Sequence, residues 1–138
     1  MAYCVRVIAF LLRNLIINRL TALRTWEMRV SCADLQKNFV SNAIKFNTKN
    51  SAAVLRTRSE NNSLILEVSD TGPGLMEGDT QKLFIKYARL SNKPTGGEKS
   101  SGLGLAICKK IIDLHNGKIG AHNNPDKGTT FWFQLPLS

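Results

Sequence analysis

The stretch L-Q-K-N-F-V-S-N-A-I-K-F-N, residues 35–47, carries two stripes at helical spacing. Its apolar residues recur every three or four positions, as the buried face of an amphipathic helix requires. The same spacing brings Asn38, Asn42 and Lys45 onto one face beside that apolar band. Solvated helix faces often carry Asn and Lys, so this stripe alone leaves a solvated surface and a ligand site as alternatives. The rest of the chain has to decide between them.

The composition is that of one folded domain. The chain has 138 residues, 43% of them hydrophobic, which is enough for a core. There are 19 Lys and Arg against 10 Asp and Glu, a formal net charge of +9. Such a charge favours a polyanionic partner without choosing between nucleic acid, acidic lipid and a triphosphate. Because the basic residues form no stripe interleaved with aromatic residues, we do not expect nucleic-acid binding.

The cysteines indicate an intracellular protein, and the first 26 residues leave more than one interpretation open. Cys4, Cys32 and Cys108 show no metal-ligand spacing, so we expect reduced thiols and no zinc site. Residues 1–26 contain no Asp or Glu, and their apolar run 7–12 is too short to span a bilayer. They are compatible with a targeting or membrane-surface helix, but we favour a helix that packs in the core or in a dimer.

Hydrophobic periodicity predicts helices and strands along the whole chain. The expected helices cover about residues 4–22, 34–46 (with Asp34 as N-cap) and 103–115. The expected strands cover about residues 26–31, 52–57, 63–69, 118–122 and 129–135. Asn61 and Asn62 predict a hairpin turn, and within the loop 70–101 only residues 83–87 look ordered. This pattern predicts an α+β fold, a two-layer α/β sandwich with helices on one face of a mostly antiparallel sheet.

Two glycine-rich segments point to a ligand. D-T-G-P-G, residues 70–74, follows a strand directly, so Asp70 could accept a hydrogen bond from an exocyclic amine such as that of adenine. A plain turn is the alternative, because Asp-x-Gly is common turn chemistry. S-G-L-G-L-A-I, residues 101–107, opens a helix and leaves backbone N–H groups free for a phosphate. It is neither a P-loop nor a dinucleotide-binding fingerprint.

A triphosphate bound at the start of that helix would explain the polar stripe of residues 35–47 as part of a ligand site. The triphosphate would bring Mg²⁺, which takes few protein ligands and keeps water and phosphate oxygens. The Asn42 amide oxygen is a suitable single ligand for that ion. Lys45 can neutralise phosphate charge, and Asn38 can position the terminal phosphate or a metal-bound water.

Five motifs in this order resemble the ATP-binding catalytic domain of sensor histidine kinases, within the ATPase group of gyrases, mismatch-repair ATPases and heat-shock chaperones. The motifs are N-F-V-S-N-A-I-K-F, D-T-G-P-G, L-F-I-K-Y-A-R-L, S-S-G-L-G-L-A-I and K-G-T-T-F-W-F-Q-L-P. The resemblance implies a Bergerat ATP-binding fold with a mixed, mostly antiparallel sheet. It covers the domain at residues 34–138, whereas the helix and strand expected in residues 1–33 match poorly.

The resemblance also implies a set of site residues. Asn42 would be the Mg²⁺ ligand, with Asn38 and Lys45 as catalytic neighbours on the phosphate side. The whole expected ATP site is Asn38, Asn42, Lys45, Asp70, Gly72, Gly74, Phe84, Tyr87, Gly102, Leu103, Gly104, Leu105 and Thr129. Thr129 would support Asp70, and Phe84 would anchor a lid over residues 75–101. Within that lid the candidates for the terminal phosphate are Arg89, Lys93 and Lys99.

The resemblance further implies partners. ATP and Mg²⁺ would be bound, and the γ-phosphoryl group would pass to a histidine on a separate dimerisation domain, and from there to a response regulator. His115 and His122 match no phosphoacceptor motif, so this chain alone should not autophosphorylate. Hydrolytic relatives carry Glu at the position of Asn38, so we expect slow hydrolysis.

Alternatives remain at this stage. The chain could be a regulatory ATP-binding module, or a degenerate kinase domain without phosphotransfer. A homodimer through the N-terminal helix fits its apolar character. We expect a cytoplasmic domain, including the case of a cytoplasmic part of a membrane-bound sensor.

Overall fold

The fold was analysed in a computed structural model of the chain, which describes residues 26–47, 51–88 and 102–137. The helix expected over about 4–22 therefore lies outside the described residues, as do the lid candidates Arg89, Lys93 and Lys99.

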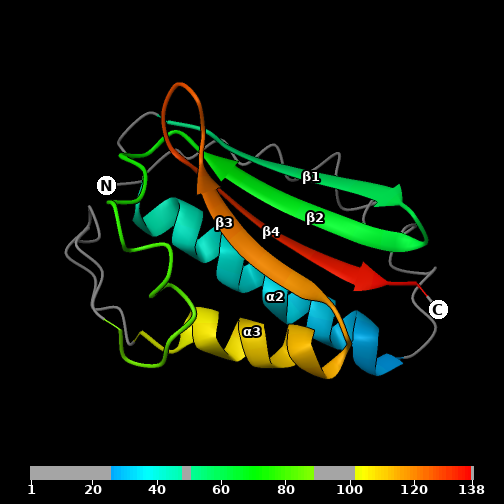
Figure 1. Cartoon of the computed structure of the whole chain (residues 1–138). Helices are drawn as coiled ribbons and strands as arrows, with labels where there is room; N and C mark the ends of the chain where they lie inside the picture. The colour runs from blue at the N-terminus through cyan, green and yellow to red at the C-terminus, as the bar shows by residue number, and fades with distance from the viewer. Residues whose placement is uncertain (1–25, 48–50, 89–101, 138) are drawn as a thin grey trace, which may run out of the picture.

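Four strands form one open sheet in the order β1-β2-β4-β3 (Figure 1). They are β1 (Ala53–Glu60), β2 (Ser63–Asp70), β3 (Lys118–Asn123) and β4 (Thr129–Pro136). All three pairings between these strands are antiparallel. Asn61 and Asn62 join β1 to β2 with φ of 47° and 57°, the left-handed backbone that a two-residue hairpin turn requires. The hairpin predicted at Asn61 and Asn62 is thus confirmed.

Two helices, α2 (Trp26–Lys45) and α3 (Gly104–Leu114), lie against the same face of the sheet (Figure 1). Alternate residues of β2 and β4 point toward them and are buried, among them Leu66 and Phe133. Phe39 of α2 packs between the rings of Phe131 and Phe133, with centroid distances of 5.8 and 5.7 Å. The predicted two-layer α/β sandwich is confirmed, and the apolar band of residues 35–47 is the side of α2 that faces the sheet.

The start of α2 differs from the prediction. The strand expected over about 26–31 is wrong, because these residues form the first turns of α2. Asp34 is not an N-cap but an exposed residue inside the helix. Residues 26–45 contain no Gly or Pro, so nothing in the backbone chemistry breaks the helix before Asp34. The division of the chain at residue 33 stays a prediction.

The remaining elements lie close to their predicted ranges. The helix expected over 103–115 is confirmed as α3, which Asn116 terminates with φ of 54°. Residues 83–87 are ordered as successive turns. Among the described helices, neither is long and apolar enough to cross a membrane.

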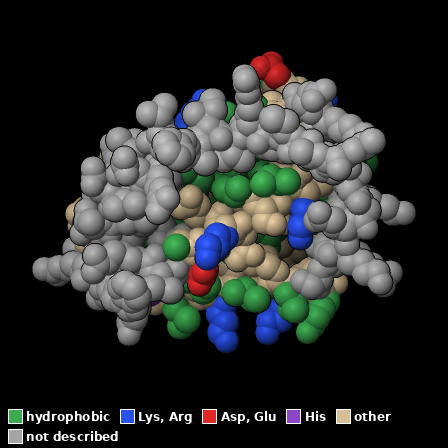
Figure 2. Space-filling view, turned by 180° about the vertical axis from the view of Figure 1, so that it is seen from behind, with side chains coloured by type: hydrophobic (Ala, Val, Ile, Leu, Met, Phe, Trp, Pro, Cys, Tyr) green, Lys and Arg blue, Asp and Glu red, His purple; other side chains and the backbone are tan. Residues whose placement is uncertain are grey.

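One face of the molecule shows more Lys and Arg than Asp and Glu among its described side chains (Figure 2). Hydrophobic side chains reach the surface along the lower edge in the same view, on the side where Figure 1 draws α3. Ile107 and Leu114 of this helix are 49% and 73% exposed.

Thr57 provides a test of the core. Its hydroxyl is buried without a hydrogen-bond partner. Thr57→Val keeps the shape and removes the unsatisfied group, so it should raise the free energy of unfolding by about 1 kcal/mol. Urea denaturation measures the change. Thr57→Ser, which keeps the hydroxyl and loses a methyl group, should instead destabilise the protein, and equal stability of the two variants would contradict this assignment.

Candidate functional site

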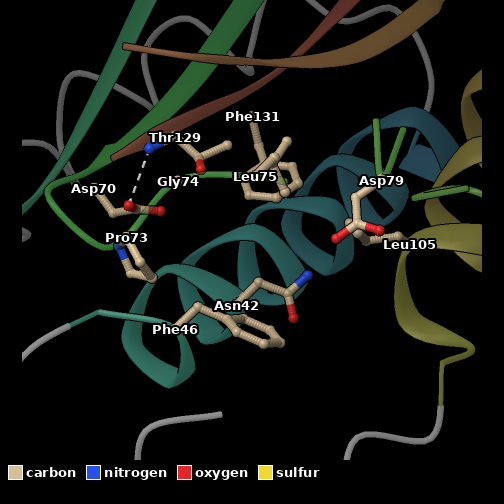
Figure 3. A pocket seen from close by; sticks show the side chains of 10 residues that line it. All are labelled: Asn42, Phe46, Asp70, Pro73, Gly74, Leu75, Asp79, Leu105, Thr129 and Phe131. Carbon is tan, nitrogen blue, oxygen red and sulfur yellow. Dashed lines mark hydrogen bonds between the residues drawn. The ribbon is translucent and has the colours of Figure 1, made fainter. Parts of the chain in front are cut away.

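A pocket opens where the ends of α2, β2 and β4 meet the start of α3 (Figure 3). It is lined by Asn42, Phe46, Asp70, Pro73, Gly74, Leu75, Asp79, Leu105, Thr129 and Phe131. About 440 Å³ of empty space lies in it when its open mouth is counted.

Asp70 is the buried acid of this pocket. It is the last residue of β2 and only 4% exposed. Its Oδ1 atom accepts hydrogen bonds from the backbone N–H groups of Gly72, at 2.9 Å, and Thr129, at 3.1 Å. Among the described residues no hydrogen bond reaches the other oxygen, Oδ2. Asp70 is therefore held by one oxygen, and the other has no hydrogen-bond donor among the described residues.

Burial controls the acidity of Asp70. Loss of contact with water raises the pKa of this carboxyl above its ordinary value of 3.8. The N–H groups of Gly72 and Thr129 act in the opposite direction and lower the pKa, but they do not cancel the effect of burial. A carboxylate kept here at the expense of stability is typical of a functional group.

Glycines let the chain approach Asp70 closely. A Cβ atom on Gly72 would lie 2.6 Å from the carbonyl oxygen of Phe46, so the loop packs directly on the end of α2. Gly128 precedes β4 with φ of +92°, and a Cβ atom there would collide with the carbonyl oxygen of Asp70. Only glycine allows β4 to begin where the Thr129 amide reaches the carboxylate.

The start of α3 forms the other side of the site. Leu103 occupies the N-cap position, and within the described part of the chain no side-chain hydrogen bond caps the helix and no acidic residue lies in its first turn. Asn38 of α2 faces this turn, because a Cβ atom on Gly104 would lie 3.1 Å from its Oδ1 atom. Asn38, one residue of the polar stripe, thus faces the N-terminus of α3, whose positive dipole end favours an anion.

The structure sorts the predicted residues into three groups. Five line the pocket: Asn42, Asp70, Gly74, Leu105 and Thr129. Three lie directly beside it, through the contacts just described: Asn38, Gly72 and Gly104. Five do not line it: Lys45, Phe84, Tyr87, Gly102 and Leu103. The roles assigned to all of these residues stay predictions.

The residues outside the pocket have other positions. Lys45 lies half-buried in the last turn of α2. Phe84 packs on the core beside α3. Tyr87 is 71% exposed, and its N–H donates to the carbonyl oxygen of Gly102 at 3.1 Å. This bond ties the described part of the predicted lid to the segment that opens α3.

The sequence did not predict that several other residues line the pocket. Phe46 and Phe131 belong to apolar patterns that predict core positions, so periodicity could not separate them from the rest. Asp79 is only 2% exposed although it lies in the glycine-rich loop, where no local pattern signals burial. The support that Thr129 gives Asp70 comes from its backbone N–H, which no residue type reveals.

The domain therefore has two layers, with a buried carboxylate at the end of β2 and the start of α3 on the other side of the pocket. The chain belongs to the family of histidine kinase-, DNA gyrase B- and HSP90-like ATPases, whose sequence model matches residues 29–138. The resemblance seen in the sequence is thereby confirmed.

Individual relatives are histidine kinases. The chain is 38% identical over 93 residues to the signal transduction histidine-protein kinase ArlS of Staphylococcus aureus, which covers 67% of the chain and 21% of ArlS. The chain therefore spans about a fifth of the length of the curated relatives it matches. The catalytic domain of histidine kinase ThkA is 31% identical with a TM-score of 0.68, over 79% of this chain and 68% of that one. The mycobacterial sensor histidine kinase MprB, 24% identical, shares the fold with a TM-score of 0.71 over 78% and 73%.

Gly128 provides a stability test for the site. Gly128→Ala should cost about 3 kcal/mol or more, since it combines an unfavourable φ with a backbone collision. Gly78 is the matched control, because its φ is +83° but a Cβ atom there meets nothing within 4 Å. Gly78→Ala should cost only about 1–2 kcal/mol, the strain term alone. Equal losses in urea denaturation would show that the contact with Asp70 is unimportant.

Asp70→Asn tests whether the buried negative charge of Asp70 lowers the free energy of unfolding. The amide oxygen can still accept from both N–H groups, while the buried charge disappears. The pKa of Asp70 is raised in the folded state, so protonation of this acid stabilises the fold. This stabilisation is fully present below pH 3.8 and is lost as the pH rises through the folded-state pKa. The variant should therefore gain stability over the wild type as pH rises above 3.8. Urea denaturation across a pH series would contradict this if the difference were constant.

Proposed function

We propose that this chain is the ATP-binding catalytic domain of a histidine kinase, which binds Mg-ATP and donates the γ-phosphoryl group to a histidine on a separate dimerisation domain. The observation that carries the proposal is the geometry of Asp70. One oxygen is fixed by two backbone amides, and the other is left to a ligand.

Adenine fits the chemistry at Asp70. An ionised carboxylate only accepts hydrogen bonds, so it pairs with the exocyclic amine of adenine and repels the carbonyl oxygen that guanine carries at the same ring position. Phe46, Leu75 and Phe131 line the pocket and offer apolar contact to a ring. Figure 3 draws Leu75 and Phe131 between the two acids, Asp70 and Asp79. Base selectivity would thus come from Asp70 and ring affinity from its apolar neighbours.

The other side of the site fits a triphosphate with its metal ion. The uncapped start of α3 offers backbone N–H groups and a favourable dipole to phosphate oxygens. Asn42, half-buried on the pocket wall, offers a neutral amide oxygen, a ligand type that Mg²⁺ accepts alongside phosphate and water. Bound Mg²⁺ would neutralise phosphate charge. We assign its protein ligand to Asn42, and phosphate-side roles to Asn38 and Lys45.

Phosphotransfer suits this site better than hydrolysis. Asn38 faces the start of α3, and an amide cannot take a proton from water at neutral pH. The nucleophile would therefore arrive on another domain, and positioning with electrostatic stabilisation would supply most of the catalysis.

Neither histidine of the chain fits the role of phosphoacceptor. His115 follows the last residue of α3. His122 is exposed on β3, and its neighbour Ala121 packs against the core on the helix side. Since side chains alternate along a strand, His122 points to the face of the sheet away from the pocket. The acceptor would thus come from a separate dimerisation domain.

The relatives support this partner assignment. ThkA, of which this chain covers 29% with 27% identity and a TM-score of 0.64, has been seen in complex with a response regulator, TrrA. We propose a response regulator as the indirect partner here. Phosphotransfer toward a response regulator would place the domain in the cytoplasm.

The first test is calorimetric titration with ADP or a non-hydrolysable ATP analogue and Mg²⁺. Asp70→Asn should weaken binding at least about tenfold, because the amine of adenine then meets an amide donor or no partner. The free energy of unfolding of Asp70→Asn is expected to equal or exceed that of the wild type at neutral pH. Weaker binding by a variant of undiminished stability would therefore be a loss of recognition and not of structure. No binding by the wild type would refute the proposal, and unchanged binding by the variant would refute the adenine assignment.

Asn42→Ala tests the metal ligand. The variant should bind the ATP analogue almost equally with and without Mg²⁺, whereas the wild type should bind more tightly with the ion. Ser41→Ala is the control, since Ser41 is exposed on the same helix and does not line the pocket. A retained Mg²⁺ effect in Asn42→Ala would contradict the assignment.

A regulatory module that holds ATP without transferring it is the second candidate, because the pocket around Asp70 would serve it equally well. Phosphotransfer from radiolabelled ATP to a supplied phosphoacceptor domain separates the two. Labelled histidine supports the kinase, whereas binding without labelling supports the module.

A further inference from the structure

Asn123, at the end of β3, holds the far end of the loop that follows Asp70. Its Oδ1 atom accepts a hydrogen bond from the N–H of Leu75 at 2.7 Å, and its Nδ2 atom donates to the carbonyl oxygen of Leu75 at 2.9 Å. Two bonds from one planar amide to both backbone groups of one residue fix its position and its orientation. The two residues are 48 positions apart in the chain, so this is a tertiary contact.

Asn124 holds the near end of the same loop. Its Nδ2 atom donates to the carbonyl oxygen of Asp70 and to Oγ of Ser69, each at 3.0 Å. Its Oδ1 atom accepts from the hydroxyl of Thr130, and its own N–H donates to the carbonyl oxygen of Gly128 at 2.9 Å. Asn124 therefore joins the end of β2 to the turn that leads into β4.

The two asparagines bracket the segment that forms one pocket wall. Asp70, Pro73, Gly74 and Leu75 all line the pocket, whereas neither asparagine does. Asn123 is exposed, so packing does not explain its presence. It also lies close to Gly74, since a Cβ atom there would be 3.1 Å from its Oδ1 atom.

We propose that Asn123 and Asn124 are positioning residues for the nucleotide base. They set the distance between the carboxylate of Asp70 and the wall made by Gly74 and Leu75, and so determine how well adenine is distinguished from other bases. This inference rests on the proposed function, because it assigns these residues to the same nucleotide pocket.

The test compares Asn123→Ala with His122→Ala, which alters the adjacent exposed residue on the opposite face of β3. Affinities for ADP and for GDP, both with Mg²⁺, are measured by calorimetry and competition on the whole chain. Asn123→Ala should bind ADP about tenfold more weakly, the effect of two lost hydrogen bonds on the bound geometry. Its preference for ADP over GDP should fall, and hydrogen exchange at the Leu75 amide should accelerate. His122→Ala should change none of these quantities.

A merely structural role predicts a different result. The affinities for ADP and GDP would then fall together, in step with a lower urea midpoint, and that outcome would overturn the proposal. Unchanged ADP affinity despite faster exchange at Leu75 would also overturn it. Absence of ADP binding by the wild type would instead refute the proposed function.

Two further variants extend the test to the case in which Asn123→Ala does not fold, and to Asn124. If Asn123→Ala does not fold, Asn123→Ser replaces it, since its hydroxyl can keep at most part of the contact. It should show a smaller loss of base preference, and an unchanged preference would overturn the proposal. Asn124→Ala should lose base preference and also lower the urea midpoint, because Asn124 joins more elements. A lower midpoint with full preference would remove Asn124 from the proposal.

Discussion

The hydrogen bonds to one carboxylate oxygen of Asp70 organise the pocket end of this domain. The Gly72 amide closes the loop after β2, and the Thr129 amide ties the start of β4 to the end of β2. Both interactions require the backbone to come close to a buried acid, which burial alone would disfavour. The burial of this acid opposes folding, and under the proposed function the acid is kept because it binds the amine of adenine.

Glycines and asparagines make this arrangement sterically and chemically possible. Gly72 and Gly128 remove the side-chain atoms that would otherwise separate the loop from α2 and from Asp70. Asn123 and Asn124 satisfy backbone groups that a loop without regular structure leaves unpaired. Much of the polar chemistry at this end of the molecule therefore positions the backbone of the loop.

Sequence reasoning succeeded where a pattern had one physical meaning and failed where two readings competed. The apolar runs of β2 and β4 and the Asn-Asn turn indicate paired strands, and these lie where expected. The residues before Asp34 suit a strand or a helix by local pattern, and the structure shows that α2 begins at Trp26 and runs through them. Asp79 and Leu75 lie in a glycine-rich loop, where local sequence carries no signal of burial or contact.

The sequence by itself determined the fold class, the order of elements and the chemical character of the site, because periodicity and glycine spacing are local properties. It singled out Asn42, Asp70 and Thr129, which lie 28 and 59 residues apart in the chain, and the structure brings all three to one pocket. Only the tertiary structure decided that a backbone amide of Thr129 supports Asp70, and that Asn123 holds Leu75. Such contacts depend on where distant backbone segments meet, and these segments meet only when the sheet has formed.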